Sequence, residues 1–590
     1  MKIPFAKYWI LLRKYLAPYR VNIVILFTFL LLSISLQLIN PQIIKYYIDT
    51  FGLLDEGLIS LNQSKLILLE AAIFYILIAI IQQILYVFSV YISLKLSWNT
   101  TNKLRSDLAS HCLNLDMSFH NKYSSGKMVE RIDGDITTLS NFFSQFSIML
   151  VANAILVFGV LTAFFIEDTG IGLIFTLFTI ATMIILYKIW NIASPYWKKV
   201  RQRSADLMGF VEEGLSGKED ARAIGGEDYI LKRFHHFSKK EYETGIKAIF
   251  VGRLVQIAIM GFVTFGTTLV YVVGIPLFEQ EMISFGTIFL LISYTELLFR
   301  PIIQIIRQLQ DLSQADASID RINEFLSINT KIEDHGNLDF DSEIVPSIKF
   351  ENISFDYISE KNVLRNISFN IEPGKSLGLI GKTGCGKTTI SRMLFRLYDP
   401  KTGRISINNI NHEEFTLKSL RSNIAYVTQK VELFQASLRD NITFFDQNIP
   451  DEKILEVIGY LELEEWFNRL PKGLDTKLLS VEAGLSAGEA QLLALTRVFL
   501  EKPSVVVLDE ASSRLDPLTE RLISRAVKNL LKDRTSIIIA HRLETLETVD
   551  KILLLEDGQV AEYGNREELD KDTNSKFATL LKMGIKEVLV

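Results

Sequence analysis

The residues best suited to chemistry lie in the stretch GKTGCGKT, at positions 381–388. Its spacing fits GxxxxGK[ST], in which glycines allow backbone N–H groups to surround phosphate oxygens. An apolar run precedes the stretch and a helix candidate follows it, so the helix N-terminus would add a favourable dipole. Lys387 is expected on the β- and γ-phosphates and the Thr388 hydroxyl on Mg²⁺. The predicted phosphate-binding residues are Gly381, Lys382, Thr383, Gly384, Cys385, Gly386, Lys387, Thr388 and Thr389.

A pair of carboxylates ends the apolar run SVVVLDE, at positions 504–510. A buried strand here would deliver Asp509 to the shell of the metal, while Glu510 could polarise an attacking water. Either acid alone could be an ordinary residue at the end of a strand. Together with a phosphate loop, the pair indicates hydrolysis of a bound nucleotide.

These two motifs must be positioned by an α/β domain. The runs SLGLIG, IAYVTQ, SVVVLD and SIIIAH are continuously apolar, as expected for strands that are buried on both faces. Helix candidates separate them. We assign this domain to residues 346–590, after an acidic and polar linker at 327–345.

The first half of the chain contains apolar runs of membrane length. A helix needs about 20 apolar residues to cross the hydrocarbon core of a bilayer. Buried helices of a soluble protein are the alternative, which the number of these runs disfavours. The sequence therefore predicts a six-helix, all-α transmembrane domain at residues 1–326. The runs are 21–39, 66–94, 141–166, 170–187, 254–278 and 282–295.

Lysine and arginine set the orientation of these helices. They are abundant in the N-terminal segment and in the stretches 95–131 and 188–203, and the short connections 51–64, 167–170 and 276–283 contain none. By the positive-inside rule, the N-terminus, both long connections and the α/β domain are cytoplasmic. The sequence thus predicts a multi-pass protein of the cell membrane, whose long cytoplasmic connections form extended helices with a tip.

Further short motifs complete a family pattern. FDY, the phosphate loop, VTQ, LSAGE, VVVLDE, SRLD and AHR occur in the order and spacing of the ATPase domain of ABC transporters. With six spans in front, the whole chain resembles an exporter-type ABC half-transporter. The stretches 104–135 and 214–228 resemble the first and second intracellular loops of that family, whose tips are coupling helices that rest on the ATPase domains.

The resemblance implies a role for each matching residue. Tyr357 would stack on adenine, and Gln429 would contact Mg²⁺ and sense the transmembrane domain. His541 would contact the γ-phosphate, and Asp516 would communicate across a dimer. The implied activity is ATP hydrolysis coupled to transport, with ATP and Mg²⁺ as cofactors. Taken singly, Tyr357 could be a packing residue, Gln429 a loop amide and His541 a core histidine.

The signature LSAGE, at positions 485–489, departs from the LSGGQ of the family. In the family, this element of one subunit meets the nucleotide that its partner holds, and Ser486 and Gly488 match it. Ala487 adds a methyl group where backbone must approach closely, at a cost that depends on its φ and ψ. Glu489 could place negative charge near a phosphate.

The altered signature also bears on the partner of the chain. In many heterodimeric ABC exporters, one of the two chains combines intact hydrolysis residues with an altered signature. We therefore favour a second, different half-transporter as partner, and a homodimer that tolerates the variants is the alternative. A net charge of −5 gives no support for nucleic-acid binding. The other expected partners are the lipid bilayer and an amphipathic small-molecule substrate.

The transported molecule is weakly encoded. Export of drugs or lipids is the leading hypothesis, and the alternatives are a peptide exporter and an ATP-gated channel or regulatory membrane ATPase. Glu296 lies within the last span, and ionisable groups at such depth tend to face a cavity or a partner. Glu296 could attract cationic substrates, or it could pair with Arg300 one helical turn away.

Overall fold

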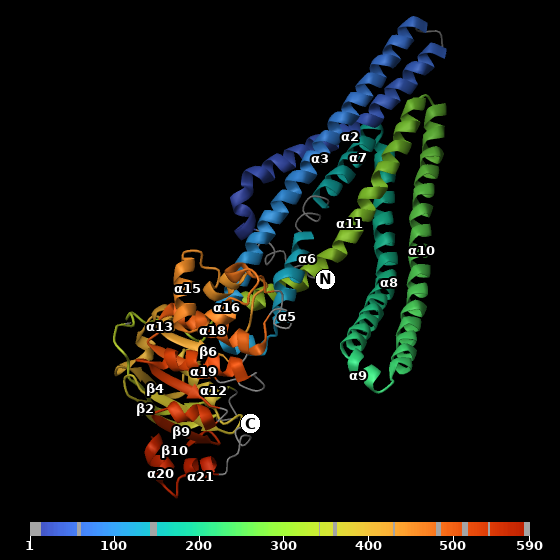
Figure 1. Ribbon diagram of the computed structural model, residues 1–590. Coiled ribbons are helices and arrows are strands. Elements are labelled where there is room, and N and C mark those ends of the chain that lie inside the picture. The colour runs from blue at the N-terminus through green and yellow to red at the C-terminus, as the bar shows by residue number, and fades with distance from the viewer. Residues whose placement is uncertain are drawn as a thin grey trace. The chain divides into compact units, whose positions relative to one another are not determined.

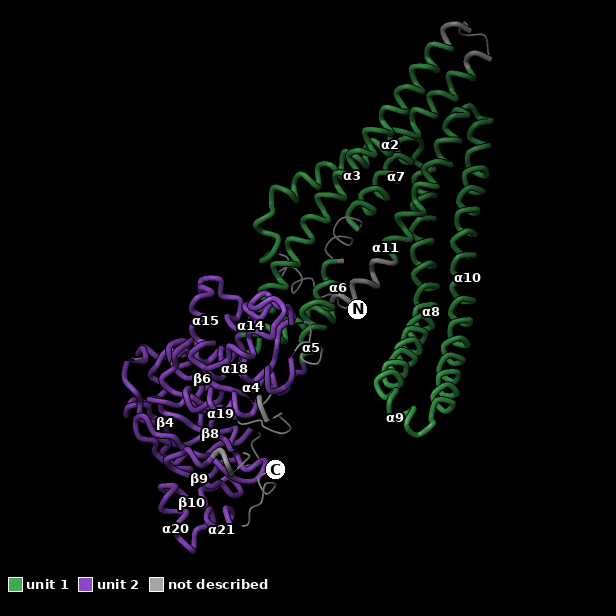
Figure 2. The backbone as a smooth tube through the Cα atoms, in the orientation of Figure 1, with its two compact units in different colours: residues 1–113, 125–328 green, residues 114–124, 329–590 purple. Residues whose placement is uncertain are grey.

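The computed structural model describes residues 13–55, 61–141, 150–341, 343–357, 363–428, 431–478, 485–509, 517–540 and 543–582. The chain forms two compact units, which Figure 2 colours separately. The first contains residues 1–113 and 125–328, and the second contains residues 114–124 and 329–590. A short segment from the first half of the sequence, 114–124, therefore belongs to the second unit.

The first unit is a bundle of long helices (Figure 1). Among the described residues, five helices are long and apolar enough to cross a membrane, and α7 is an apolar helix of 17 residues. They correspond to the six predicted spans, which confirms the all-α transmembrane domain; the part of the third run at 142–149 lies outside the described residues. The helices are α2 (Arg20–Asp55), α3 (Leu61–Asn114), α7 (Val151–Glu167), α8 (Thr169–Ser216), α10 (Glu227–Glu279) and α11 (Phe285–Leu326).

Two of these helices continue far beyond their apolar runs. α8 extends to Ser216 and α10 begins at Glu227, with the short helix α9 (Lys218–Ala223) between them. Figure 1 shows α9 at the tip of this pair. Gly217 ends α8, and Gly225 has a φ of +65°, a conformation that residues with a Cβ rarely adopt. The expected extended helices with a tip are thus present.

Polar contacts tie α2 to α7 and α11. Lys45 on α2 forms an ion pair of 2.6 Å with Glu167, the last residue of α7. Asp49 accepts hydrogen bonds from the backbone N–H of Gly286 and the hydroxyl of Ser284 at the start of α11. A Cβ on Gly286 would lie 2.6 Å from the carbonyl oxygen of Lys45, so this close approach requires glycine.

The second unit is an α/β domain with two sheets (Figure 1). The larger has the order β10-β9-β3-β8-β7-β6 and is parallel except at β10, and the smaller is antiparallel with the order β2-β1-β4-β5. All four predicted apolar runs are strands of the larger sheet, which confirms the α/β prediction. The strands are β1 (Ile348–Phe355), β2 (Leu364–Ile371), β3 (Ser376–Gly381), β4 (Thr402–Ile407), β5 (Ile410–Asn411), β6 (Ile424–Val427), β7 (Val505–Asp509), β8 (Thr535–Ile539), β9 (Lys551–Glu556) and β10 (Gln559–Asn565).

Helices complete this unit. The first helix after β3, α12, buries Ile390 and Met393 in the core, which fixes its position against the strands. The helices are α4 (Met117–Lys122), α12 (Lys387–Leu394), α13 (Leu417–Asn423), α14 (Leu438–Thr443), α15 (Asp451–Tyr460), α16 (Glu464–Phe467), α18 (Ala487–Glu501), α19 (Pro517–Leu531), α20 (Arg566–Lys571) and α21 (Lys576–Lys582).

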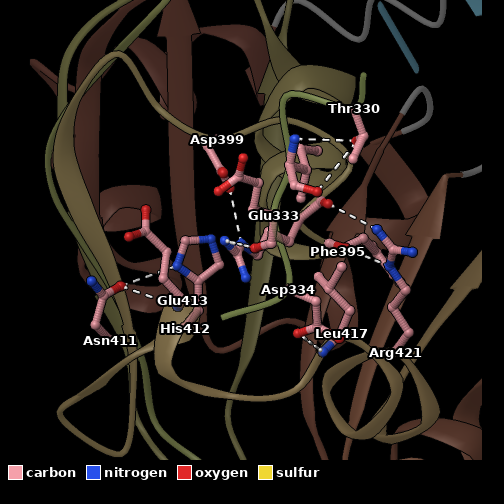
Figure 3. Close-up of polar contacts among 12 residues, drawn as sticks. Thr330, Glu333, Asp334, Phe395, Asp399, Asn411, His412, Glu413, Leu417 and Arg421 are labelled. Carbon is pink, nitrogen blue, oxygen red and sulfur yellow. Dashed lines mark hydrogen bonds and ion pairs between the residues drawn. The ribbon is translucent and has the colours of Figure 1, made fainter. Parts of the chain in front are cut away.

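Residues of the predicted linker form hydrogen bonds with the rest of the α/β unit. The carbonyl group of Glu333 accepts a hydrogen bond of 3.1 Å from Arg396, and the carboxylate of Asp334 accepts one of 3.0 Å from the N–H of Leu417 (Figure 3). Arg396, which follows α12, is nearly fully buried and forms an ion pair of 3.1 Å with Asp399. One buried guanidinium group therefore joins the linker to the end of α12.

The short helix α4 packs on the same unit. Asp116 caps its N-terminus and also accepts a hydrogen bond of 2.7 Å from the N–H of Lys331. Asn121 donates a hydrogen bond of 2.7 Å to the hydroxyl of Tyr398. The stretch that resembles the first intracellular loop thus contributes a helix to the α/β unit.

Candidate nucleotide-binding site

The phosphate loop and the acidic strand end lie at one edge of the larger sheet. β3 and β7 both pair in parallel with β8, so their carboxyl ends point the same way. β3 ends at Gly381, where the loop begins, and β7 ends at Asp509. Ligands of open α/β sheets bind outside the carboxyl ends of the strands. The fold therefore brings together two motifs that are far apart in the sequence.

Two glycines of the loop are required by its backbone. Gly381 has a φ of +147°, and a Cβ there would lie 2.3 Å from the carbonyl oxygen of Leu555. Gly386 has a φ of +108°, and its Cβ would lie 2.4 Å from the side chain of Leu364. Gly386 also forms the N-cap of α12. The exposed residues of the loop, where a phosphate could approach, are Lys382, Thr383 and Gly384.

Lys387 is the buried cation of this site. It is 6% exposed, and its Nζ donates to the carbonyl oxygens of Gly381 at 2.5 Å and of Lys382 at 3.2 Å. Burial lowers the pKa of its ammonium group, because a charge is disfavoured away from water. Neutral carbonyl groups only partly compensate for this loss of hydration, whereas the oxygens of a triphosphate would supply opposite charge. Lys387 and the loop therefore fit the phosphates of a nucleotide.

Thr388 and Asp509 offer oxygen atoms to a metal ion. Thr388 is half-buried at the start of α12, and Asp509 is buried at the end of β7. Mg²⁺ prefers such oxygens and is held by one or two carboxylates together with phosphates and water. Within the described residues, no cluster of three or more His, Cys, Asp or Glu could hold a metal ion. The donor set fits Mg²⁺ that is bound together with a nucleotide.

Four predicted site residues lie outside the described residues: Gln429, Glu510, Asp516 and His541. Their roles stay predictions from the family motifs. The strands that lead to Gln429 and Glu510 are β6 and β7, which pair in parallel. Both strands therefore run toward the edge of the sheet that carries the phosphate loop.

Tyr357 presents a supported aromatic ring beside α12. Its hydroxyl lies 3.0 Å from the hydroxyl of Thr389, and Phe355 and Tyr398 contact its ring edge-to-face at centroid distances of 5.0 and 5.1 Å. Tyr357 remains 40% exposed, as stacking on a nucleobase requires.

The cysteine of the phosphate loop carries no charge. Cys385 is buried, and burial raises the pKa of its thiol, so its side chain stays neutral.

The signature LSAGE forms the N-terminus of α18. Ser486 is the N-cap, its hydroxyl accepts from the N–H of Glu489 at 3.2 Å, and the Glu489 carboxylate accepts from the N–H of Ser486 at 2.7 Å. This reciprocal pair is a capping box, for which S-x-x-E before an apolar run was an overlooked sequence signal. Ala487 is the first residue of the helix and is exposed, so its backbone conformation tolerates a Cβ. Gly488 is buried.

Glu296 lies on α11 with an exposed side chain. Arg300 is exposed as well, and no ion pair joins these two described residues, so the expected alternative of an intrahelical pair is not formed. The carboxylate of Glu296 is therefore accessible for a ligand or a second subunit.

Another polar residue of the same bundle has a partner. Asn153 donates a hydrogen bond of 2.8 Å to Gln304, which joins α7 to α11.

Two further residues at the site carry no motif signal. Tyr426 on β6 donates a hydrogen bond of 2.9 Å to the carboxylate of Asp509. Tyr398 packs against Tyr357 and accepts the hydrogen bond from Asn121 of α4. Both contacts join elements that are distant in the sequence, so spacing within a motif could not predict them.

Comparison with known proteins agrees with this architecture. The family model of the ABC transporter transmembrane region matches residues 23–302, and that of the ABC transporter matches residues 364–513. The uncharacterized ABC transporter ATP-binding protein YknV of Bacillus subtilis is 30% identical, over 96% of this chain and 92% of the relative. The ATP-dependent lipid A-core flippase 1 of Colwellia psychrerythraea is 29% identical, over 88% of this chain and 87% of the relative.

A solved structure shows the same fold. The structure of a bacterial Atm1-family ABC exporter with ATP bound has a TM-score of 0.80 and 22% sequence identity, covering 96% of this chain and 99% of that chain. The chain is thus a multi-pass membrane protein that couples ATP hydrolysis in a cytoplasmic domain to transport and works as a dimer. It belongs to the ABC transporter family, as a half-transporter of the exporter type.

Proposed function

We propose that this chain exports or flips amphipathic small molecules, drugs or lipids, as one half of a dimeric transporter. Two features of this chain together carry the proposal. The chain contains helices long enough to cross a membrane, and it also contains a phosphate loop whose buried Lys387 lies at the same sheet edge as Asp509. The name of one relative, a lipid A-core flippase, supports a lipid-like cargo.

Hydrolysis of ATP would depend on residues around the γ-phosphate. Glu510 would orient the attacking water, His541 would hold the γ-phosphate, and Lys387 would bind the phosphate oxygens. Bound Mg²⁺ would neutralise negative charge that develops on the phosphates. Its expected ligands are Thr388, Gln429 and Asp509.

A partner subunit would complete each nucleotide site. Ser486 and Gly488 would meet the γ-phosphate that the partner holds, and Asp516 would lie at the same interface. We favour a heterodimer, because the hydrolysis residues of this chain are intact while Glu489 replaces the glutamine of the signature. The partner would then carry an unaltered LSGGQ and lack the catalytic glutamate. A homodimer with two mild variants is the alternative.

The tip helix α9 would transmit motion between subunits. Ile224, directly after α9, is 83% exposed and offers an apolar contact. On the α/β unit, the apolar residues Val431, Phe434 and Phe444 line a groove of about 420 Å³. In a dimer, the α/β unit of a partner would provide such a groove to α9, in keeping with the coupling helix that the family resemblance implies.

The test is ATP hydrolysis by this chain purified alone in lipid nanodiscs, with the mass of the assembly determined. We expect no hydrolysis until a second, different half-transporter is added. Hydrolysis by a dimer of this chain alone would contradict the heterodimer and establish a working homodimer. ATP-dependent accumulation of an amphipathic dye in inverted vesicles is expected for an exporter, whereas ATP-dependent conductance without accumulation would indicate a channel.

Replacing Glu296 by glutamine is expected to reduce the transport of cationic substrates about fivefold and to leave neutral substrates unaffected. The reason is that an exposed carboxylate within a membrane-spanning helix attracts cations, while glutamine keeps the shape without the charge. Uptake of a panel of cationic and neutral dyes into inverted vesicles measures the difference. Glu70→Gln on α3 is the matched control, since Glu70 is also exposed in an apolar run. Equal transport of the cationic panel by Glu296→Gln would reject the assignment.

A further inference from the structure

The hydroxyl group of Tyr426 contacts Asp509, the carboxylate that the proposed mechanism assigns as a ligand of Mg²⁺. Tyr426 lies on β6 opposite Val507 of β7, two residues before Asp509. Its hydroxyl reaches along the sheet and donates a hydrogen bond of 2.9 Å to Oδ2 of Asp509. The motif that contains Tyr426, IAYVTQ, assigns a role to Gln429 and none to the tyrosine.

The ring of Tyr426 is held from the side of α12. Phe395, directly after α12, contacts it at a centroid distance of 5.4 Å and an interplanar angle of 48°. The ring that carries this hydroxyl group therefore packs against the end of the helix that begins at the phosphate loop.

We propose that Tyr426 is a positioning residue for Asp509, which holds the carboxylate in the orientation that binds Mg²⁺ with ATP. The proposal rests on the proposed nucleotide site. Hydrogen bonds to charged groups stabilise more than those between neutral groups. Loss of this bond would remove one of the contacts that orient the Asp509 carboxylate, and the metal would then contribute less to ATP binding.

The experiment compares the affinity for ATP with and without metal. Full-length protein in nanodiscs, carrying Glu510→Gln to prevent hydrolysis, is titrated with ATP by calorimetry, once with Mg²⁺ and once with EDTA. Mg²⁺ should strengthen ATP binding in the presence of Tyr426. In Tyr426→Phe, which keeps the ring, this gain should fall about tenfold, while the affinity in EDTA stays unchanged.

The matched control is Tyr563→Phe, whose hydroxyl donates to the carbonyl oxygen of Asn370 in the same unit. It should leave both affinities unchanged. An unchanged gain from Mg²⁺ in Tyr426→Phe would overturn the proposal, and so would an equal loss of affinity in EDTA, which would indicate general damage to packing. Failure of the protein with Tyr426 to bind ATP in either condition would instead reject the nucleotide site itself.

Discussion

Replacement of Lys387 by alanine is expected to lower ATP hydrolysis at least about 100-fold. Lys387 is the buried ammonium group of the phosphate loop, and two loop carbonyl groups hold it in place. Without it, the charge that develops on the γ-phosphate would lose a preorganised donor, and removal of one such donor costs about 100-fold to 1,000-fold in rate. The measurement is the rate of phosphate release by the assembled transporter in nanodiscs.

The same loop provides the control for this prediction. Lys382 carries the same charge, but its side chain is exposed at the front of the loop. Lys382→Ala is expected to change the rate by less than about threefold, because alanine keeps the backbone N–H group that the loop offers to phosphate and the exposed side-chain charge is screened by water and salt. If both variants lost the same fraction of the hydrolysis rate, the effect would come from the total positive charge of the loop and not from the buried position of Lys387. Thermal unfolding without nucleotide checks that both variants are folded.

Where the nucleotide site that receives this signature has a catalytic glutamate, replacement of Glu489 by glutamine is expected to raise the hydrolysis rate of that site about fivefold to tenfold. Glutamine can keep the capping box with Ser486, because its side-chain oxygen also accepts from the backbone N–H. Only the negative charge near the γ-phosphate of the partner is removed. At an effective dielectric constant of about 20, one charge at about 8 Å costs roughly 2 kcal/mol before screening by salt.

Two related variants separate charge from helix capping. Glu489→Ala removes the charge and the cap together, and loss of a capping interaction costs about 1 kcal/mol, so its gain should be smaller. Ala487→Gly should change the rate less than about twofold, because Ala487 already adopts a helical conformation and is exposed. A larger effect of Ala487→Gly than of Glu489→Gln would contradict the electrostatic account of this signature.

The response of the homodimer and the heterodimer differs in this experiment. In a homodimer, both sites would receive the altered signature, and Glu489→Gln should raise total hydrolysis. In a heterodimer, the altered signature would serve only the weak site of the partner, and total hydrolysis should rise only if that site regains a catalytic glutamate. The variant therefore also tests the favoured heterodimer.

Elements whose signals are local could be predicted from the sequence alone. The phosphate loop lies between β3 and α12 because one short stretch contains the glycines, Lys387 and Thr388 in order. Continuous apolar runs predicted the membrane helices and the buried strands, since hydrophobic length alone decides whether a segment can span a bilayer or a sheet interior. The capping box at Ser486 also has a local signal, because its pattern lies within four consecutive residues, although that pattern was overlooked.

The side chains that support these elements could not be predicted from the sequence and are known from the folded chain. The bond from Tyr426 to Asp509 spans 83 positions, that from Lys45 to Glu167 spans 122, and that from Asn121 to Tyr398 spans 277. Such contacts follow from the order of strands in a sheet and from the packing of helices. The spacing of residues within a motif carries no information about either, so these supporting contacts could be found only once the chain was folded.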